Sequence, residues 1–398
     1  MAPGAFIDLF QPIAVQHSAK SSSVQASVLV GPRNLQLEYR HLPEPASGEL
    51  QIAIKYTGVC GSDVSYYKKF CNGDLKAVGP LTLGHESSGV VEAIGEGVTG
   101  FHVGDRVALE VGVPCDSCRA CQKGRYNLCP KMRFRSSAKS IPHFQGTLQQ
   151  KLNHPAKWCH KIPAHVSLEA AAMLEPLAVA IHATRRASIE PGDTAIVFGA
   201  GTVGLLTAAM AQISGASNVL IADLDAGRVA YALNNRFATK GFVVEAPNYT
   251  GSTEDKIRFA QELADDVVTE AFKGREAFDD LQGADVVFDC TGKEMCVQAG
   301  LFAARPGGQL VMVGMGTPIQ TLQMSAAHLK EVDIIGIFRY CGTYATGIRL
   351  LSSGVLPGLE DMITHRFKGL ASTQEAMELA SRTVDDKGNL VLKVLIEA

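Results

Sequence analysis

Short apolar runs broken by glycine and proline characterise the chain from about Val24 to Val111. Runs such as LQIAIKY and SSGVVEAIG have the length and boundaries that are typical of β-strands. From about Glu175 onward, apolar runs alternate with helical segments: TAIVFGAG, TVGLLTAAMAQISGA, NVLIADLD, EDKIRFAQELADDVVTEAF, ADVVFDCTG and GQLVMVGMG. This strand–helix–strand order predicts a parallel sheet with helices on both faces. After about Val332 the pattern becomes irregular again.

These patterns predict two domains, and a length of 398 residues is consistent with that number. We expect an α/β protein in which a β-rich domain, residues 24–175 and 336–398, is interrupted by a doubly wound (Rossmann) domain, residues 176–335. Residues 1–23 are expected to form a tail, with a short apolar segment that can dock on its own domain.

Charge and apolar content limit the partners of the chain. The formal net charge is −3, which gives no indication of a nucleic-acid partner or an anionic membrane. No apolar run approaches the roughly 20 residues needed to span a bilayer. The N-terminal stretch lacks a basic start followed by an apolar core, and it contains Asp8 and no Arg, so neither a secretion signal nor a transit peptide is expected. The predicted compartment is the reducing cytoplasm, where disulfides are not expected.

Four cysteines lie close together in the stretch PCDSCRACQKGRYNLCP. Disulfides, a metal site or catalytic chemistry could each use such a cluster, and a reducing compartment favours the metal. The spacing is C-x2-C-x2-C-x7-C, and four thiolates form a closed tetrahedral zinc site that leaves no position for substrate. The alternative of four unrelated buried thiols fits the polar loop poorly. We therefore predict a structural zinc held by Cys115, Cys118, Cys121 and Cys129.

The stretch GAGTVG carries glycines 199, 201 and 204 in the spacing G-x-G-x-x-G, between a predicted strand and a predicted helix. In that context, Gly199 allows the tight turn, Gly201 admits a pyrophosphate, and Gly204 lets helix pack on strand. The helix N-terminus stabilises the phosphate charge. Asp223 ends the next strand, where a carboxylate accepts hydrogen bonds from the ribose hydroxyls of NAD; Leu224 follows it, rather than an Arg that could bind the phosphate of NADP. The alternative is a glycine-rich turn with a surface aspartate.

A second metal site is suggested by GVCGSD, which offers Cys60, and by LGHESSG, which offers His85 and Glu86. A single Cys or His is usually a packing residue, so this evidence is weaker than that for the four-cysteine cluster. Glu175 lies in the apolar stretch AAMLEPLAVAIHA at the predicted domain junction. A buried carboxylate needs a partner, and a metal, or water on a metal, would serve.

These segments together resemble the zinc-dependent medium-chain dehydrogenases, and within them the polyol group of sorbitol, xylitol and L-arabinitol dehydrogenases. The resemblance runs from about Val24 to the C-terminus and rests on GVCGSDV, LGHESSG, GDRVALE, the four-cysteine stretch, NHPAKWCHKIP, MLEPLAVAIHA, GAGTVG, VFDCTG, FRYC and THRF. It implies a GroES-like β-rich catalytic domain, a Rossmann domain that binds NAD, one catalytic and one structural zinc per chain, and a homotetramer. FRYC and LEP favour the polyol group, since ordinary alcohol dehydrogenases of the family carry a third cysteine ligand where this chain has Glu175.

The resemblance also implies residue roles. Cys60, His85 and Glu86 are similar to the catalytic zinc ligands, and Glu175 to the residue that holds a zinc-bound water or a substrate hydroxyl, although either carboxylate can be the direct ligand in relatives. Asp63 resembles the carboxylate that orients the His ligand. The remaining roles are a proton-relay hydroxyl, Ser62; contacts to the polyol chain, Tyr66, Arg339 and Tyr340; and the lining of the NAD site, Val203, Asp223, Arg228, Val313, Gly314, Met315, Ile337, Phe338 and Arg339.

The implied reaction is the oxidation of a secondary hydroxyl of a sugar alcohol to a ketose. Zinc lowers the pKa of the bound hydroxyl, and the resulting alkoxide releases hydride to NAD. The alternatives are an enzyme of the same fold acting on another secondary alcohol or on an amino alcohol, and a non-catalytic protein that senses NAD(H). Activity over a panel of alcohols would distinguish a polyol dehydrogenase from an enzyme acting on another alcohol. Zinc-dependent turnover of any polyol would eliminate the non-catalytic sensor.

The chain departs from the polyol group at three places. RFRSSAKSIPHFQGT follows the zinc lobe where relatives usually have a Pro-Pro turn, so residues 134–147 are expected near the substrate cleft and leave the exact polyol open. Residues 241–280 are longer than usual for the third strand and helix. Ser65 stands where many relatives have a His that takes the relayed proton; we expect the proton to leave through Ser65 or through water held by Glu175, unless Ser65 faces away from the relay. The remaining histidines and cysteines are expected to be surface or packing residues.

Overall fold

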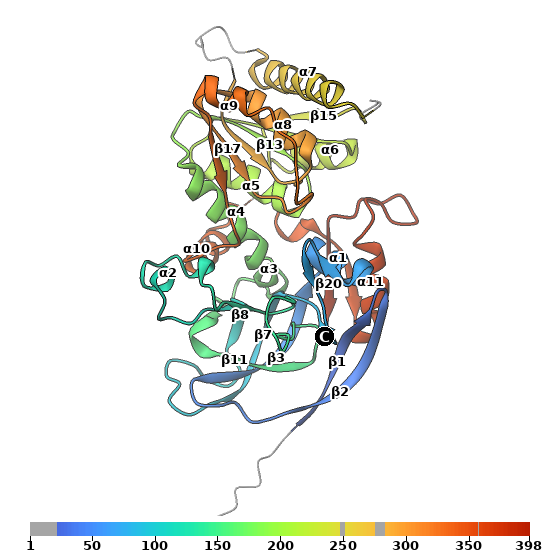
Figure 1. Cartoon of the computed structure of the whole chain (residues 1–398). Helices are drawn as coiled ribbons and strands as arrows, with labels where there is room; N and C mark the ends of the chain where they lie inside the picture. Colours follow the sequence, from blue (N-terminus) through green and yellow to red (C-terminus); the bar gives the residue numbers. More distant parts are fainter. Residues whose placement is uncertain (1–21, 247–250, 275–282, 357) are drawn as a thin grey trace, which may run out of the picture.

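The computed structural model describes residues 22–246, 251–274, 283–356 and 358–398. Two lobes are stacked end to end, with the parallel sheet in one and the β-rich layers in the other (Figure 1). The last strands of the chain return to the β-rich lobe, where β20 lies beside β3. Within these described ranges, no helix has the length and apolar character required to cross a membrane.

The β-rich domain is built on a seven-stranded sheet in the order β12-β8-β7-β3-β20-β19, with β11 also paired to β3. Its strands are β3 (Glu49–Gly58), β7 (Glu86–Ile94), β8 (Arg106–Leu109), β11 (Lys151–Pro155), β12 (Cys159–Lys161), β19 (Ile363–Lys368) and β20 (Lys393–Glu397). Alternate residues of β3 and β7 pack into one apolar cluster that includes Leu50, Ile52 and Val91. This sheet fixes the ends of β3, β7 and β20, which lie at the candidate site.

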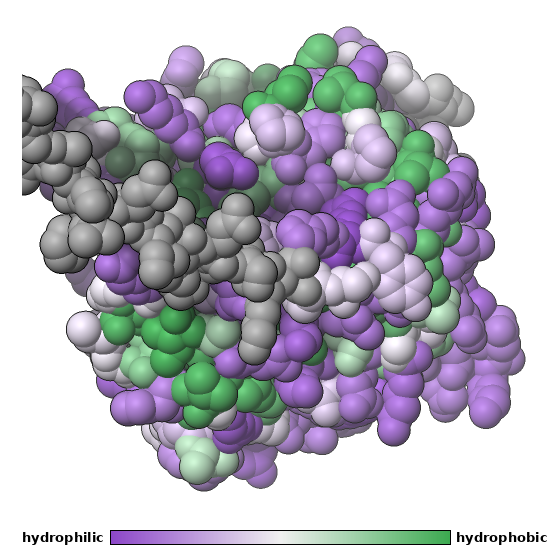
Figure 2. Space-filling model, turned by 90° about the horizontal axis from the view of Figure 1, so that it is seen from below, coloured by the Kyte–Doolittle hydropathy of each residue, from purple (hydrophilic) through white to green (hydrophobic). Residues whose placement is uncertain are grey.

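A second, three-stranded sheet in the order β2-β1-β6 covers one side of this domain. Its strands are β1 (Ser22–Gly31), β2 (Asn34–Leu42) and β6 (Leu81–Thr82). Figure 2 shows this end of the molecule from below, where hydrophilic side chains predominate and apolar ones gather in small groups. On β2, Leu37 is 43% and Tyr39 is 75% exposed, so the outer face of this edge strand is only partly polar.

Short elements connect the strands of the β-rich domain. The helices are α1 (Gly61–Lys69), α2 (Arg119–Gln122), α3 (Leu168–Ala172), α10 (Tyr344–Ser353) and α11 (Thr373–Leu379). The two-stranded ribbons are β4 (Cys71–Asn72) with β5 (Leu75–Lys76), and β9 (Gly112–Val113) with β10 (Arg133–Phe134). The loop that follows β9 carries α2 and the four clustered cysteines.

The other domain is a six-stranded, all-parallel sheet in the order β15-β14-β13-β16-β17-β18. Its strands are β13 (Thr194–Phe198), β14 (Asn218–Asp223), β15 (Lys240–Val243), β16 (Ala284–Asp289), β17 (Ala304–Met312) and β18 (Asp333–Gly336). Successive residues of a strand face opposite sides. Ala195 and Val197 therefore belong to one buried cluster, and Ile196 and Phe198 belong to another.

Helices cover both of these faces. Residues of α5 (Thr202–Ser214) and α6 (Ala226–Asn234) contribute to the first cluster, and residues of α7 (Thr253–Phe272), α8 (Glu294–Ala303) and α9 (Met324–Lys330) contribute to the second. The strand order reverses beside β13, and in open α/β sheets ligands bind at such a point, at the carboxyl ends of the strands.

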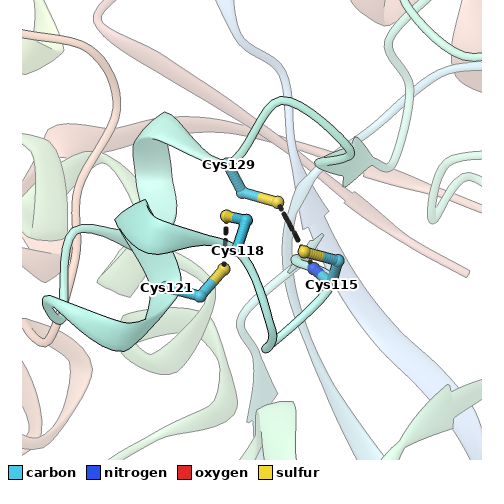
Figure 3. Close-up of side chains that lie close together, drawn as sticks. All are labelled: Cys115, Cys118, Cys121 and Cys129. Atoms are coloured by element: carbon cyan, nitrogen blue, oxygen red, sulfur yellow. Dashed lines mark hydrogen bonds between the residues drawn. The ribbon is translucent and has the colours of Figure 1, made fainter.

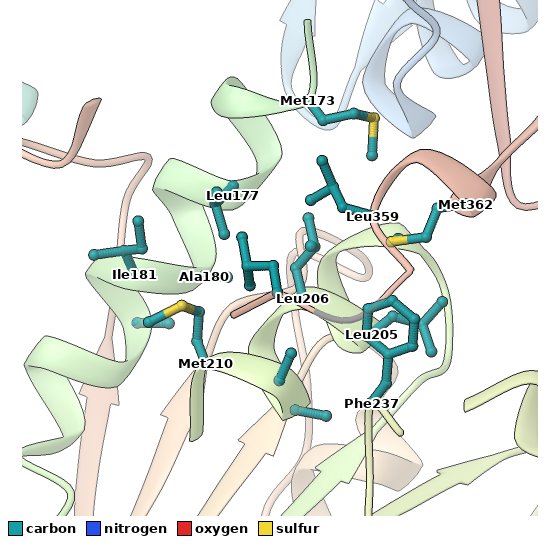
Figure 4. Close-up of a cluster of buried hydrophobic side chains, with 14 of the residues drawn as sticks. Met173, Leu177, Ala180, Ile181, Leu205, Leu206, Met210, Phe237, Leu359 and Met362 are labelled. Carbon is teal, nitrogen blue, oxygen red and sulfur yellow. The ribbon is translucent and has the colours of Figure 1, made fainter. Parts of the chain in front are cut away.

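The two domains share a continuous apolar core along α4 (Leu174–Ala187). Figure 4 shows this cluster, in which side chains of α4 meet side chains of α5 and of the segment around Leu359 and Met362. Leu177 and Leu206 are fully buried there, and burial of such side chains stabilises by about 1.5–3 kcal/mol each. The helix that begins at the candidate site is thus held by the core of both domains.

The predicted α/β architecture is confirmed: a β-rich domain and an all-parallel sheet with helices on both faces are both present. After Val332, where the sequence pattern becomes irregular, the chain forms β18, α10, β19, α11 and β20. These elements are short, and their apolar residues pack against several partners, so no single period stands out. Of the predicted tail, residues 22 and 23 begin β1, and residues 1–21 lie outside the described residues. Of residues 241–280, the stretches 247–250 and 275–280 lie outside them as well.

Candidate active site and metal centres

Three potential metal ligands from two segments meet at the ends of β3 and β7. Ligand atoms of Cys60, His85 and Glu86 all lie within 4.8 Å of one another. Cys60 is the residue that precedes α1, and Glu86 is the first residue of β7, paired with Gly58 of β3. A Cβ on Gly58 would lie 2.3 Å from Oε2 of Glu86, so a larger residue here would displace the carboxylate. The thiolate, imidazole and carboxylate donors suit zinc.

Asp63 holds the two segments together. Its Oδ2 accepts a hydrogen bond from the Cys60 backbone N–H at 3.1 Å, and its Oδ1 accepts one from the Gly84 N–H at 3.0 Å. The same Oδ1 lies 3.4 Å from Nδ1 of His85. Burial opposes ionisation of this carboxyl, but His85 and the two N–H groups hold its pKa below the ordinary value. Asp63 thereby occupies the Nδ1 side of the imidazole and leaves the other ring nitrogen for a metal.

Glu86 also forms a buried ion pair, with Lys393, that the sequence did not predict. Nζ of Lys393 on β20 lies 2.7 Å and 2.9 Å from the two carboxylate oxygens and donates to the Val59 carbonyl at 3.0 Å. Glu86 is 1% exposed and Lys393 is 3% exposed. The sequence feature that could have revealed this pair is the lysine within the apolar strand VLKVLIE, at a position that the strand pattern assigns to the interior. The Glu86 carboxylate therefore contacts the Lys393 ammonium group and also lies at the position that a metal would occupy.

These ligands open into a cleft of about 390 Å³ between the two domains. Glu175, in the first turn of α4, lines it and is 6% exposed. Burial raises the pKa of Glu175 to about 7, against the opposing effect of His85. The other predicted site residues that line the cleft are Ser62, Tyr66, Val203, Val313, Gly314, Met315, Ile337, Phe338 and Arg339.

Ser65 is also among the residues that line this cleft. Its hydroxyl donates a hydrogen bond to the Cys71 carbonyl at 2.9 Å. A hydroxyl in this arrangement keeps its oxygen lone pairs available to accept a proton from a neighbour. Ser62, one turn before it on α1, lines the same cleft beside Cys60.

Arg339 and Tyr340 are separated by the structure. The Arg339 guanidinium lies over the Phe134 ring, 3.6 Å from its centroid, at the wall of the cleft. Burial lowers its pKa to about 10, which leaves it charged at neutral pH. The Tyr340 side chain is 3% exposed and packs against the Tyr344 ring. Arg339 is among the residues that line the cleft and Tyr340 is not, so the contact of Tyr340 with a substrate stays a prediction.

The unusual segment 134–147 does reach the cleft, and it adds contacts that the sequence analysis did not identify. The Ser136 hydroxyl lies 2.8 Å from Nδ1 of His85, and the Ala138 N–H donates to the Tyr66 hydroxyl at 3.1 Å. Two further hydroxyl or aromatic groups of the segment line the cleft, Phe134 and Ser137. The segment therefore forms one wall of the site, and the Tyr66 hydroxyl is held by it.

The G-x-G-x-x-G loop has the geometry of a phosphate cradle. Gly199 has φ +97°, a conformation that favours glycine. A Cβ on Gly204 would lie 1.7 Å from the Gly199 carbonyl oxygen, so only glycine fits. A Cβ on Gly201 would meet only Arg228 Nη1, at 3.8 Å, which leaves open space where α5 begins. The residues present thus fit a dinucleotide pyrophosphate at a helix N-terminus.

Asp223 closes the other side of this loop. Its Oδ2 accepts from the Ala200 N–H at 2.6 Å, and its Oδ1 accepts from the Asp225 N–H at 2.9 Å. Each carboxylate oxygen retains a free lone pair, so hydrogen bonds to ribose hydroxyls remain available. Leu224 is 61% exposed beside it, and Arg228 Nη2 donates to the Val391 carbonyl.

The four clustered cysteines converge on one point, as Figure 3 shows. All four Sγ atoms lie within 4.8 Å of one another, and the distances are 3.5 Å both from Cys118 to Cys121 and from Cys115 to Cys129. These separations are much longer than the roughly 2.05 Å of a disulfide and suit a tetrahedral zinc with bonds of about 2.3 Å. The donor set therefore fits a structural metal.

Comparison with known proteins finds matches in both the β-rich domain and the parallel-sheet domain. The alcohol dehydrogenase GroES-like domain matches residues 46–164, and the zinc-binding dehydrogenase domain matches residues 246–353. D-xylulose reductase A of Aspergillus oryzae is 36% identical over 379 residues, 95% of this chain and 97% of that protein. Sorbitol dehydrogenase of Gallus gallus is 37% identical over 351 residues, 88% of this chain and 91% of that protein. L-Idonate 5-dehydrogenase of Escherichia coli has a TM-score of 0.80 at 26% identity, and the match covers 96% of this chain and 99% of that structure.

Proposed function

Since the chain belongs to the zinc-dependent medium-chain dehydrogenases, in their polyol group, we propose that it oxidises a secondary hydroxyl of a sugar alcohol to a ketose with NAD. The observation that carries the proposal is the shared cleft. The Cys60–His85–Glu86 cluster and residues beside the dinucleotide loop, among them Val203 and Val313, line one cavity. A substrate held at the first can therefore reach a nicotinamide held at the second.

The bound groups would supply the reactive centres: zinc at Cys60, His85 and Glu86 is a Lewis acid for a hydroxyl, and NAD is a hydride acceptor. The side chains of the protein then bind the substrate and move its proton. Ser62 can accept the hydroxyl proton and pass it to Ser65 or to water. Ser65 cannot store the proton as an imidazole would, because a serine hydroxyl has no pKa near neutrality.

Glu175 and Arg339 give the cleft a polar wall suited to a polyol. Glu175 has a pKa of about 7, so it exchanges between carboxylate and carboxylic acid near neutral pH and can hold water or a substrate hydroxyl in either form. Arg339 carries a buried Nη1 with no hydrogen-bond partner among the described residues. Because Arg339 also lines the cleft, its guanidinium can donate to the additional hydroxyls of a polyol, and a site built for hydroxyls discriminates against analogues that lack them.

Four finer assignments belong to the proposal. NAD is preferred over NADP, because Asp223 would repel the additional phosphate and Leu224 offers it no charge. A structural zinc occupies the four-cysteine site and stabilises its loop. By family resemblance the enzyme is a homotetramer. Cytoplasmic location is supported by the ten free thiols, which suit a reducing compartment.

A panel of five- and six-carbon polyols, with 2-propanol and an amino alcohol as comparison substrates, tests the proposal through NADH formation. We expect at least one polyol to exceed the comparison alcohols in kcat/KM by more than tenfold, with NAD favoured over NADP. Higher efficiency with the amino alcohol or with 2-propanol would favour the alternative enzyme. Binding of NADH with no turnover of any alcohol by the zinc-loaded protein would favour a sensor.

A further inference from the structure

The loop that carries Arg339 is held in an uncommon backbone conformation. Arg339 has φ +51°, in the left-handed region that non-glycine residues seldom adopt, and Gly342 has φ +62°. Such a conformation costs on the order of 1 kcal/mol or more and persists only where surrounding contacts determine it. The contacts to this backbone include one from Arg185, whose Nη1 donates to the Gly342 carbonyl at 3.0 Å, and two from the four-cysteine loop.

Two adjacent residues of that loop bond to the backbone on either side of Arg339. Asn127 donates from Nδ2 to the Phe338 carbonyl at 2.8 Å, and the Gly342 N–H donates to the Tyr126 hydroxyl at 2.7 Å. More than 200 residues of sequence separate each pair. Both bonds are made to backbone atoms, so they specify the path of the chain regardless of the side chains between them.

Tyr126 and Asn127 are themselves fixed. Asn127 is 2% exposed. The Tyr126 hydroxyl also donates to Oε1 of Glu110, a 2% exposed carboxylate whose Oε2 is 2.8 Å from Nε2 of His160. The Tyr126 ring lies 4.9 Å from the Trp158 ring. A hydrogen-bonded network of this kind is rigid, because every member is positioned by another.

The Arg339 side chain extends from this held backbone to the cleft. The Arg339 guanidinium is placed between the Phe134 and Phe338 rings, 3.6 Å and 4.7 Å from their centroids. Arg339 lines the cleft there, and its Nη1 is buried without a hydrogen-bond partner among the described residues. Rotation of the 338–342 backbone would move this group off the Phe134 ring and out of the cleft.

We propose that Tyr126 and Asn127 are positioning residues for the polyol: they hold the Phe338–Gly342 backbone so that Arg339 presents its guanidinium to the substrate. The four-cysteine loop thereby contributes to substrate selectivity as well as to stability. The inference rests on the proposed function, in which Arg339 binds the polyol chain. It adds residues that touch neither substrate nor cofactor and that act only through Arg339.

Asn127→Leu tests the proposal, because leucine has a similar volume and no donor for the Phe338 carbonyl. We expect kcat/KM for the best polyol to fall about 10- to 100-fold, mainly through KM, as for loss of a hydrogen bond at a buried group. The efficiency with 2-propanol, the KM for NAD and the zinc content should change less than about twofold. Tyr126→Phe, which removes the hydroxyl that accepts from the Gly342 N–H, should act in the same direction and provides the test if Asn127→Leu does not fold.

A double-mutant cycle separates positioning from general structure. In an Arg339→Ala background, Asn127→Leu should reduce polyol kcat/KM by less than about threefold, because the group through which it acts is already absent. Leu128→Ala, at a 48% exposed neighbour in the same loop, is the matched control and should behave as wild type. An undiminished loss in the Arg339→Ala background, or an equal loss with 2-propanol, would overturn the inference. Wild-type protein that oxidises no polyol would instead refute the proposed function.

Discussion

Replacing Lys393 with Met removes the ammonium group that neutralises Glu86 and keeps the length of the side chain. Nζ of Lys393 makes three short contacts, two to Glu86 and one to the Val59 carbonyl, and all of them are buried. The substitution therefore leaves a 1% exposed carboxylate without its ammonium partner. A buried carboxylate cannot recover this loss from solvent.

The expected loss of stability follows from these contacts. Breaking a buried ion pair by removing one partner costs about 3–5 kcal/mol. Zinc at Cys60, His85 and Glu86 would supply a second cation to the same carboxylate. We therefore expect the full loss in zinc-free Lys393→Met and a loss smaller by on the order of 1–2 kcal/mol when zinc is bound.

Urea unfolding of the zinc-loaded and zinc-free proteins measures both quantities. The chain has one tryptophan, Trp158, which is 7% exposed in the β-rich domain and reports on its unfolding. Glu86→Gln with Lys393→Met is the matched control, because the pair is then neutral. The double variant should be more stable than Lys393→Met alone. A stability of Lys393→Met within about 0.5 kcal/mol of wild type, or additive losses in the double variant, would refute the reasoning.

Three further predictions concern the cofactor, the proton and pH. Asp223→Ser with Leu224→Arg should move the kcat/KM ratio toward NADP by removing a repulsion and adding a phosphate partner; a ratio equal to that of wild type would contradict this. Ser65→His should add an ionisation near pH 6.5 to the pH profile of polyol oxidation, and an unchanged profile in folded, zinc-loaded protein would show that this position is not the proton exit. Burial lowers the pKa of His182 to about 4, below its ordinary 6.5, so its contribution to stability is complete above pH 6.5 and is lost as the pH falls toward 4. Wild type should therefore lose more stability than His182→Leu between pH 7.5 and pH 5 in urea unfolding, and equal losses would contradict the assignment.

The features that the sequence could predict are those in which residue spacing itself carries the chemistry. The glycine spacing after β13 predicts a turn, a close approach and a packing contact, and Gly199, Gly201 and Gly204 have that geometry. The four cysteines are close in sequence, so a short loop is enough to bring their sulfurs together. The grouping of Cys60 with His85 had weaker support from the residues alone, because their contact depends on how β3 and β7 align.

The contacts that the sequence could not predict join distant segments through single atoms. Lys393 on a buried strand indicates that some acidic partner exists, but the identity of Glu86 depends on the pairing of β20 with β3. The motif FRYC gives no indication that Arg339 faces the cleft and Tyr340 faces the core, because that division follows from the backbone angles of the loop. Asn127 is an ordinary polar residue until the fold brings the Phe338 carbonyl to it.

Polyol-dependent NADH formation, followed together with metal content as zinc is removed and returned, tests the central claim most directly. We expect two zincs per chain in active protein. Removal of the zinc at Cys60, His85 and Glu86 should abolish NADH formation while the protein stays folded. Cys60→Ser should lack that zinc and that activity, and it should keep the zinc of the four-cysteine site. A Cys60→Ser protein, or a zinc-free wild type, that still forms NADH from a polyol at the wild-type rate would contradict the claim.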